Sequence, residues 1–248
     1  MKYKVQIKEL EASYKEKKIL SNVSFNIKPG SFCAIAGPNG AGKSTFLKAM
    51  IKMIQINKNS IFIDNTVIDT LTQKNMAALI SMVPQNGKTN ASFSVREAVQ
   101  LGRYIYKDNK NVDKALETVG ISNLADRSIT SLSGGEFQLA MLARSVCQDA
   151  PLLALDEPIN NLDLYHQLRL MRLLKELQNQ GKTIICVLHD LNTILHYCSD
   201  VYLIKDGKLF SQGSPQEVLT KETIKEVFNV NSIQVDIKGT KQLIFQAV

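Results

Sequence analysis

The segment from Gly37 to Ser44 constrains the fold of this 248-residue chain more than any other feature. It reads Gly-Pro-Asn-Gly-Ala-Gly-Lys-Ser, which fits the spacing G-x-x-x-x-G-K-[ST] in full. Residues 31–36 before it are apolar and predict a strand, and residues 43–53 after it have the apolar spacing of a helix. Glycines let backbone N–H groups approach phosphate oxygens, and a helix start adds the positive end of its dipole. The segment therefore predicts a triphosphate-binding loop, with Lys43 at the β- and γ-phosphates and the Ser44 hydroxyl available to Mg²⁺.

An acidic pair follows a second apolar strand candidate. Residues 152–155 are Leu-Leu-Ala-Leu, and Asp156 and Glu157 come directly after them. A buried strand ending beside the phosphate loop would bring Asp156 to Mg²⁺ through water and Glu157 to the γ-phosphate. Because the phosphate loop is complete, we interpret Glu157 as the residue that orients the attacking water.

The pattern of apolar residues predicts an α/β fold. Strand-like and helix-like segments alternate, and central strand candidates such as residues 183–188 are apolar throughout, which is typical of a mostly parallel sheet covered on both faces. The first thirty residues show near-alternation of apolar and polar positions and predict strands. Residues 95–150 lack β-branched runs and contain amphipathic pieces such as residues 112–119, so we expect a helical insert there.

Periodicity predicts several further elements. A helix is expected near residues 216–228, and strands are expected near residues 232–237 and 242–247. One apolar helix face is predicted from Leu164, Leu168, Met171, Leu174 and Leu177. Four methionines at helical spacings are interpreted as core residues: Met50, Met53, Met141 and Met171.

Composition excludes several classes of protein. Charged residues make up 21% of the chain and apolar residues 44%, which is normal for a globular protein and argues against wholesale disorder. The longest apolar run, Ile184 to Leu188, is too short to cross a membrane, and residues 1–5 lack an apolar signal core, so we expect neither a secreted nor an integral membrane protein. The four cysteines fit no zinc spacing, and we expect buried, reduced thiols. The net charge of +7 fits nucleic acid, an anionic membrane surface or simple surface lysines, and does not decide among them.

Additional motifs, in the same order along the chain, make it resemble the ATP-binding cassette ATPase family. Residues 132–136, Leu-Ser-Gly-Gly-Glu, resemble the signature motif of that family. The resemblance implies a lid glutamine at Gln85, a switch histidine at His189 and an adenine-stacking ring at Tyr14. It implies a dimer-contact loop formed by Asn161, Leu162 and Asp163. The implied ATP-binding residues are Tyr14, Gly37, Pro38, Asn39, Gly40, Ala41, Gly42, Lys43, Ser44, Thr45, Gln85, Ser133, Gly134, Gly135 and Glu136. The implied metal ligands are Ser44, Gln85 and Asp156, and the implied catalytic residues are Glu157 and His189.

The resemblance also implies an architecture. It is a P-loop NTPase cassette of the α/β class, with a mostly parallel core sheet, N-terminal antiparallel β strands and a helical subdomain inserted before the signature motif. We expect residues 1–85 and 151–228 to form the nucleotide-binding core, residues 86–150 the helical subdomain, and residues 229–248 a tail packed on the core. Two copies would sandwich two ATP molecules head to tail, so that each ATP meets Lys43 of one chain and both Ser133 and Gly135 of the other.

Five stretches narrow the resemblance to importer ATPases for ferric siderophores, haem and cobalamin. They are residues 93–99, 101–104, 162–167, 189–192 and 213–220. Such proteins pair with two permease subunits at the cytoplasmic face of the membrane and, through them, with a substrate-binding protein. This subunit would not touch the cargo, so its sequence does not identify which complex is carried.

Two other functions were weighed. A soluble cassette ATPase for iron–sulfur or other cofactor assembly is disfavoured by residues 102–104 and 189–192. A nucleic-acid-associated cassette is disfavoured because the chain has neither tandem cassettes nor a long coiled coil, so no nucleic-acid partner is expected. One departure from the family is that Phe137-Gln138-Leu139 stands where Arg-Gln-Arg is common, which removes two positive charges from the signature helix.

Overall fold

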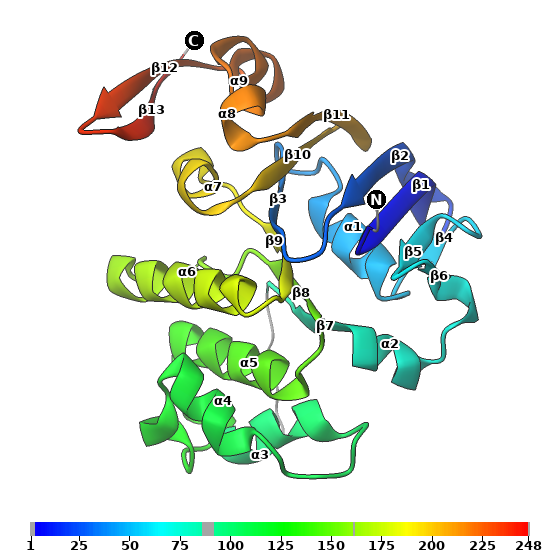
Figure 1. The fold of residues 1–248 in the computed structure, drawn as a ribbon, viewed down its shortest axis with the longest axis vertical. Coiled ribbons are helices and arrows are strands. Elements are labelled where there is room, and N and C mark those ends of the chain that lie inside the picture. Colours follow the sequence, from blue (N-terminus) through cyan, green and yellow to red (C-terminus); the bar gives the residue numbers. More distant parts are fainter. Residues whose placement is uncertain (1–2, 86–91, 161, 248) are drawn as a thin grey trace. The chain divides into compact units, whose positions relative to one another are not determined.

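The structure, a computed structural model, describes residues 3–85, 92–160 and 162–247 (Figure 1). Its contacts divide the chain into two compact units. The first unit comprises Met1–Thr70 and Ile185–Val248, and the second comprises Leu71–Ile184. The sequence predicts other boundaries, at residues 85/86 and 150/151. Those boundaries are based on the positions of family motifs and not on contacts between residues, and they stay a prediction.

The first unit begins with an antiparallel sheet. Its strands follow the order β2-β1-β5-β6, and β4 also pairs with β1. The strands are β1 (Val5–Tyr14), β2 (Lys17–Ile27), β4 (Gln55–Ile56), β5 (Ile61–Ile63) and β6 (Thr66–Val67). Burial along β2 alternates toward its end, as its near-alternating sequence predicts for a sheet with one covered face. The N-terminal antiparallel strands are thus confirmed.

A second sheet in the first unit carries the phosphate loop. β3 (Phe32–Ala36) pairs in parallel with β10 (Asp200–Lys205), and β10 pairs antiparallel with β11 (Lys208–Gly213). The order is β11-β10-β3-β9, where β9 (Thr183–Val187) enters this unit at Ile185. All five residues of β3 are buried, in agreement with a parallel strand covered on both faces.

Helix α1 (Lys43–Met50) packs on this part of the core through an aromatic cluster. The ring of Phe25 lies 5.3 Å from that of Phe46 on α1 and 4.3 Å from that of Tyr202 on β10, measured between centroids. The Tyr202 hydroxyl donates to the Asn26 carbonyl over 2.6 Å. Burial raises the pKa of the Tyr202 phenol far above its usual range, so the ring stays neutral. These contacts anchor the helix that opens at the phosphate loop.

The C-terminal part of the first unit contains three helices and a hairpin: α7 (Leu191–Tyr197), α8 (Pro215–Val218), α9 (Lys221–Phe228), β12 (Val230–Ile237) and β13 (Thr240–Ala247). The hairpin is tied to α7 by the side chain of Asn192, which accepts from Leu243 N at 2.8 Å and donates to Leu243 O at 3.0 Å. His196 Nε2 also lies 2.9 Å from Lys241 O. Residues 189–192 therefore contain an anchor for the tail.

The second unit combines two parallel strands with a group of helices. β7 (Ile80–Val83) pairs in parallel with β8 (Leu152–Asp156). The helices are α2 (Gln73–Leu79), α3 (Val95–Gln100), α4 (Val112–Val119), α5 (Gly134–Gln148) and α6 (Leu164–Asn179). Helices α3 and α4 precede the signature residues, as expected, and both pack on α5 (Figure 1). The predicted helix at residues 112–119 is confirmed to the residue.

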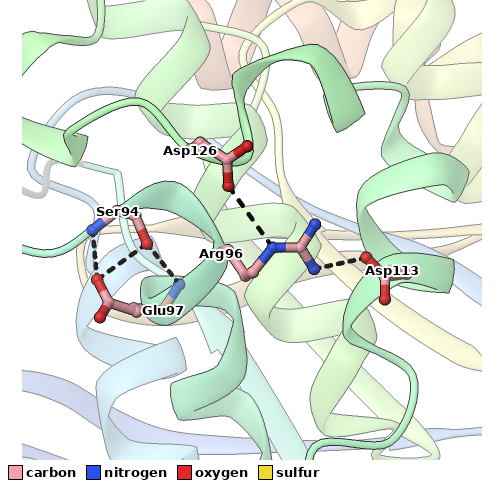
Figure 2. Close-up of polar contacts among 5 residues, drawn as sticks. All are labelled: Ser94, Arg96, Glu97, Asp113 and Asp126. Atoms are coloured by element: carbon pink, nitrogen blue, oxygen red, sulfur yellow. Dashed lines mark hydrogen bonds and ion pairs between the residues drawn. The ribbon is translucent and has the colours of Figure 1, made fainter.

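Polar contacts fix the start of the helical segment (Figure 2). Ser94 caps α3: its Oγ accepts from Glu97 N at 3.2 Å, and Glu97 Oε2 accepts from Ser94 N at 2.8 Å. Arg96 extends from α3 to two carboxylates, Asp113 on α4 at 2.5 Å and Asp126 at 3.9 Å. The stretch at residues 93–99 is thus a helix cap followed by a cross-link between helices.

The structure corrects three expectations based on periodicity, two of them about burial and one about the length of a helix. On α6, Leu164 and Leu168 are 70% and 43% exposed, and burial begins only at Leu170. Met53 is 66% exposed because α1 ends at Met50, so it is not a core residue. The helix expected near 216–228 is interrupted between Val218 and Lys221 and forms α8 and α9.

Within the described residues, the longest helix falls short of the length and apolar character that a bilayer-spanning segment needs. All four cysteine side chains are buried.

Candidate active site

The phosphate loop depends on glycine at three of its positions. Gly37, Gly40 and Gly42 have φ values of 146°, 78° and 106°, in the region that residues with a Cβ rarely adopt. A Cβ on Gly37 would lie 2.0 Å from Ile204 O, and one on Gly42 would lie 2.5 Å from Leu20 Cδ2. The loop therefore has the special backbone that its glycines predict, and the structure adds close packing against Ile204 and Leu20.

The Lys43 side chain folds back over the loop. Its Nζ donates to Gly37 O and to Pro38 O, both at 2.9 Å, and the residue is only 5% exposed. The ammonium is thus held directly above the carbonyls that precede the glycine-rich turn. Lys43 and Ser44 also open α1, whose N-cap is Gly42 and whose first turn contains no acidic residue. The backbone N–H groups and helix dipole at this point favour an anion.

His189 lies at the same edge of the sheet as this loop. It directly follows Leu188, whose N–H donates to Ile35 O of β3 at 3.3 Å. β3 ends at Ala36 and leads into Gly37, so the two segments leave neighbouring parts of the sheet at the same end. The expected switch histidine and phosphate loop are thereby brought together within the first unit.

Tyr14 ends β1 and is 41% exposed, so its ring is accessible for stacking. The Nζ atom of Lys48 on α1 lies 5.8 Å from the ring centroid. This places the tyrosine beside the helix that follows the phosphate loop. The expected adenine-stacking role remains a prediction.

The second unit brings together the acidic pair and the expected lid glutamine. Asp156 ends β8 and is 3% exposed, and Glu157 follows it at 9% exposure with a φ of 51°. Gln85 Nε2 donates to Glu157 Oε2 from the segment after β7. Because β7 and β8 are parallel neighbours, both residues leave the same edge of the sheet. The structure therefore brings Gln85 and Glu157 together across 72 positions of sequence.

Glu157 has a second amide partner that sequence reasoning missed. Asn160 Nδ2 donates to the same carboxylate oxygen, Oε2. The signal in the sequence was the position of Asn160, three residues after the expected catalytic glutamate and one before the expected dimer-contact loop.

Ser133 of the signature motif is the N-cap of α5. Its Oγ accepts from Glu136 N at 3.3 Å, while Glu136 Oε2 accepts from Ser133 N at 2.8 Å. Arg127, also absent from the sequence-based site, pairs with Glu136 Oε1 at 3.0 Å. Hydrogen bonds from Ser133 and the charge of Arg127 lower the pKa of Glu136. The signature segment is thus a capped helix start whose carboxylate is neutralised by a neighbouring arginine.

The dimer-contact loop is described at two of its three residues, because Asn161 lies outside the described residues. Leu162 is buried, and Asp163 is exposed and caps α6 by accepting from His166 N at 2.9 Å. The ring of His166 lies 2.8 Å from the same oxygen, and its bonds lower the pKa of Asp163. Gln167 Nε2 donates to Ile159 O at 3.3 Å and to Leu162 O at 2.9 Å. The stretch at residues 162–167 therefore holds Leu162 and Asp163, the two described residues of this loop, in place.

The expected ATP-binding residues form two groups. The phosphate loop, Tyr14 and His189 belong to the first unit, and Gln85, the acidic pair and the signature segment belong to the second. In the first group, a lysine side chain and a helix N-terminus favour binding of an anion. In the second, a carboxylate held by two side-chain amides lies in the same unit as the capped N-terminus of α5, groups suited to the terminal phosphate of a triphosphate.

Comparisons with known proteins agree with these features. The profile of the family described as ABC transporter matches residues 20–160. The ferric enterobactin transport ATP-binding protein FepC of Escherichia coli is 34% identical over 94% of this chain and 90% of its own. The hemin import ATP-binding protein HmuV of Pseudoalteromonas translucida is 31% identical over 90% of this chain and 91% of its own.

Solved structures show the same fold. An inward-facing putative metal-chelate type ABC transporter matches with a TM-score of 0.84 at 25% identity, over 100% of this chain and 98% of that one. A dimeric ATP-binding cassette in a post-hydrolysis state with ADP and phosphate matches with a TM-score of 0.77 at 27% identity, over 85% of this chain and 98% of that one. The phosphate loop, the signature helix and these relatives together show that the chain belongs to the ABC transporter family as an ATP-binding cassette ATPase.

Proposed function

We propose that this chain is the ATP-hydrolysing subunit of a membrane importer for an iron complex, a ferric siderophore or haem, or a related chelate such as cobalamin. The observation that carries the proposal is the match, over about nine-tenths of both chains, to ATP-binding proteins named for import of ferric enterobactin and hemin. A cassette for cofactor assembly, the alternative, is not favoured by these names.

The described residues suit the steps of hydrolysis. Lys43 and the loop amides bind the phosphates, Tyr14 stacks on adenine, and Glu157 orients and deprotonates the attacking water. His189 contacts the γ-phosphate from the end of β9. Support comes from the clamped carboxylate of Glu157 and from the anion cradle at the start of α1.

The donor set suits a magnesium ion as cofactor. The Ser44 hydroxyl, the Asp156 carboxylate and the Gln85 side-chain carbonyl are all hard oxygen ligands, which Mg²⁺ prefers. Gln85 donates through Nε2 to Glu157, an orientation in which its amide oxygen serves as the ligand atom. When bound, the ion would neutralise charge on the phosphate oxygens.

Two copies of the chain form the active ATPase in this proposal. The Ser133 cap and the N–H groups at the start of α5 face the γ-phosphate held by the partner's loop, so ATP binding closes the dimer and hydrolysis releases it. The dimeric relative with ADP and phosphate supports this arrangement.

A groove on the helical segment is the proposed docking surface for the permease at the cytoplasmic face of the membrane. It has a volume of about 870 Å³ and is lined by α2, α3 and residues 101–109. Its rim exposes apolar side chains, with Leu101 at 46%, Tyr104 at 78% and Phe93 at 43%. Exposed aromatic residues around a concave surface are typical of protein interfaces. The substrate-binding protein would contact the permease and not this chain.

The proposal is tested by uptake and by turnover in parallel. A strain lacking this chain is supplied with the wild-type protein, Glu157→Gln or the control Glu222→Gln. It is grown with a ferric siderophore or haem as the sole source of iron, or with cobalamin as the sole source of that compound. Glu222 lies in the first turn of α9, outside the active-site residues. We expect the Glu157→Gln protein to bind ATP but to hydrolyse it at least ~10²-fold more slowly than wild type, and cells that contain it to take up no cargo. The control Glu222→Gln should hydrolyse ATP and support uptake as wild type does. Normal uptake of all three cargoes without the chain would refute the importer function.

A further inference from the structure

The carboxylate of Glu157 accepts from two side-chain amides on one oxygen. Gln85 Nε2 and Asn160 Nδ2 both donate to Oε2; Gln85 comes from the segment after β7, whereas Asn160 lies three residues after Glu157. Two donors on one oxygen restrict the rotation of the carboxylate about its last two bonds. Charge-assisted hydrogen bonds of this kind are the stronger ones in proteins.

Asn160 is held where it can make this contact. Its own N–H donates to Glu157 O at 3.2 Å, which closes a tight turn over residues 157–160. That turn contains Glu157 in a left-handed backbone conformation, at a φ of 51°. Downstream, Leu162 N donates to Ile159 O at 3.3 Å, and Gln167 from α6 binds the same carbonyl. Ile159 and Leu162, on either side of Asn160, are therefore both held by the 16-residue helix α6.

We infer that Asn160 is a positioning residue for ATP hydrolysis, which orients the Glu157 carboxylate toward the attacking water. The inference rests on the proposed ATPase function. Asn160 is itself exposed, so its amide is not a buried structural group that the fold needs for stability. Gln85 holds the same oxygen from the segment after β7, but it is also a proposed metal ligand. Asn160 is thus the donor whose removal tests orientation without removing a metal ligand.

The inference makes Asn160 a link between the dimer-contact loop and the base. Its side chain binds Glu157, and the next residues along the chain are those expected to touch the partner copy.

The test compares four full-length proteins: wild type, Asn160→Ala, Asn160→Asp and the control Asn123→Ala. Asn123 is an exposed asparagine of the same unit with no role in the site. Asparagine and aspartate have the same shape, but aspartate lacks the N–H donors and adds a like charge beside Glu157. Steady-state kcat and KM for ATP are measured together with the melting temperature of each protein.

We expect Asn160→Ala to lower kcat about 10-fold, with KM within about 2-fold of wild type and no change in melting temperature, because an interaction of the base is lost and ATP contacts are kept. The kcat of Asn160→Asp should fall by at least as much as that of Asn160→Ala. The kcat and KM of Asn123→Ala should equal those of wild type. In a Glu157→Gln background, Asn160→Ala should change the residual rate less than about 2-fold, since the two residues act as one unit.

Three results would overturn the inference. Asn160→Ala could keep the wild-type kcat, Asn160→Asp could match wild type so that shape alone matters, or the 10-fold loss could persist in the Glu157→Gln background. Failure of the proposed function is distinguishable, because in that case the wild-type protein itself hydrolyses no ATP.

Discussion

Replacing Gly102 with alanine tests how tightly the helical segment is packed. Gly102 lies in the short 3₁₀ turn Leu101–Arg103, and a Cβ built on it would lie 2.3 Å from Arg144 O and 3.1 Å from Gln148 N. Both atoms belong to the backbone of α5, so no side chain can rotate away. To reach an ordinary contact, the turn and the helix must separate by about 1 Å, a displacement that costs about 2–3 kcal/mol in a packed interior.

For a chain of this size, that cost corresponds to a fall in melting temperature of roughly 5–10 °C. Circular dichroism melts of wild type, Gly102→Ala and Gly134→Ala measure it. Gly134 is the matched control because a Cβ there meets no atom within 4 Å and it lies at the first position of α5, where alanine is the better helix former. A melting temperature for Gly102→Ala within about 1 °C of wild type would refute the steric reasoning.

Three further predictions concern the site and the core. Lys43→Ala should weaken binding of a fluorescent ATP analogue at least ~10-fold, because the only side-chain cation of the phosphate loop is lost; unchanged binding would remove the phosphate-loop assignment. Ser133→Arg should stop hydrolysis while monomers still bind nucleotide, and normal turnover would contradict the shared-site dimer. Burial raises the pKa of Cys147 from 9.0 to about 11. The folded chain therefore keeps a proton that the unfolded chain loses between these values, so stability should fall as pH rises through this window. Urea titrations at several pH values measure the free energy of unfolding of wild type and of Cys147→Ala. If this free energy changes with pH equally in both proteins, the prediction is contradicted.

The sequence was sufficient for features determined by neighbours along the chain. The phosphate loop is specified by glycines and a lysine within eight residues, and its left-handed positions occur where the motif puts them. The helix at residues 112–119 and the apolar strand predicted at residues 183–188 also occur, the latter as β9 (Thr183–Val187). Local backbone preference and apolar spacing decide these elements before any distant contact forms.

Periodicity failed where packing chooses among possible faces. The spacing of leucines on α6 predicts a helix but not where its burial starts, so Leu164 and Leu168 were assigned to the core although they are exposed. Likewise, Met53 continues the spacing of α1 but lies beyond its last turn. A helix has several apolar stripes that differ little in sequence, and the neighbouring elements decide which of them is covered.

The sequence by itself therefore determined the chemistry of the site: a triphosphate loop, an acidic pair, a signature segment and the family to which they belong. Only the tertiary structure decided the partners of Glu157, since Gln85 is 72 positions away and reaches it through the parallel pairing of β7 with β8. It also showed that Arg127 pairs with Glu136 and that Asn160 donates to the Glu157 carboxylate. The physical reason is range: a motif records which groups are present within a few residues, whereas the orientation of a carboxylate depends on donors that folding brings from elsewhere in the chain.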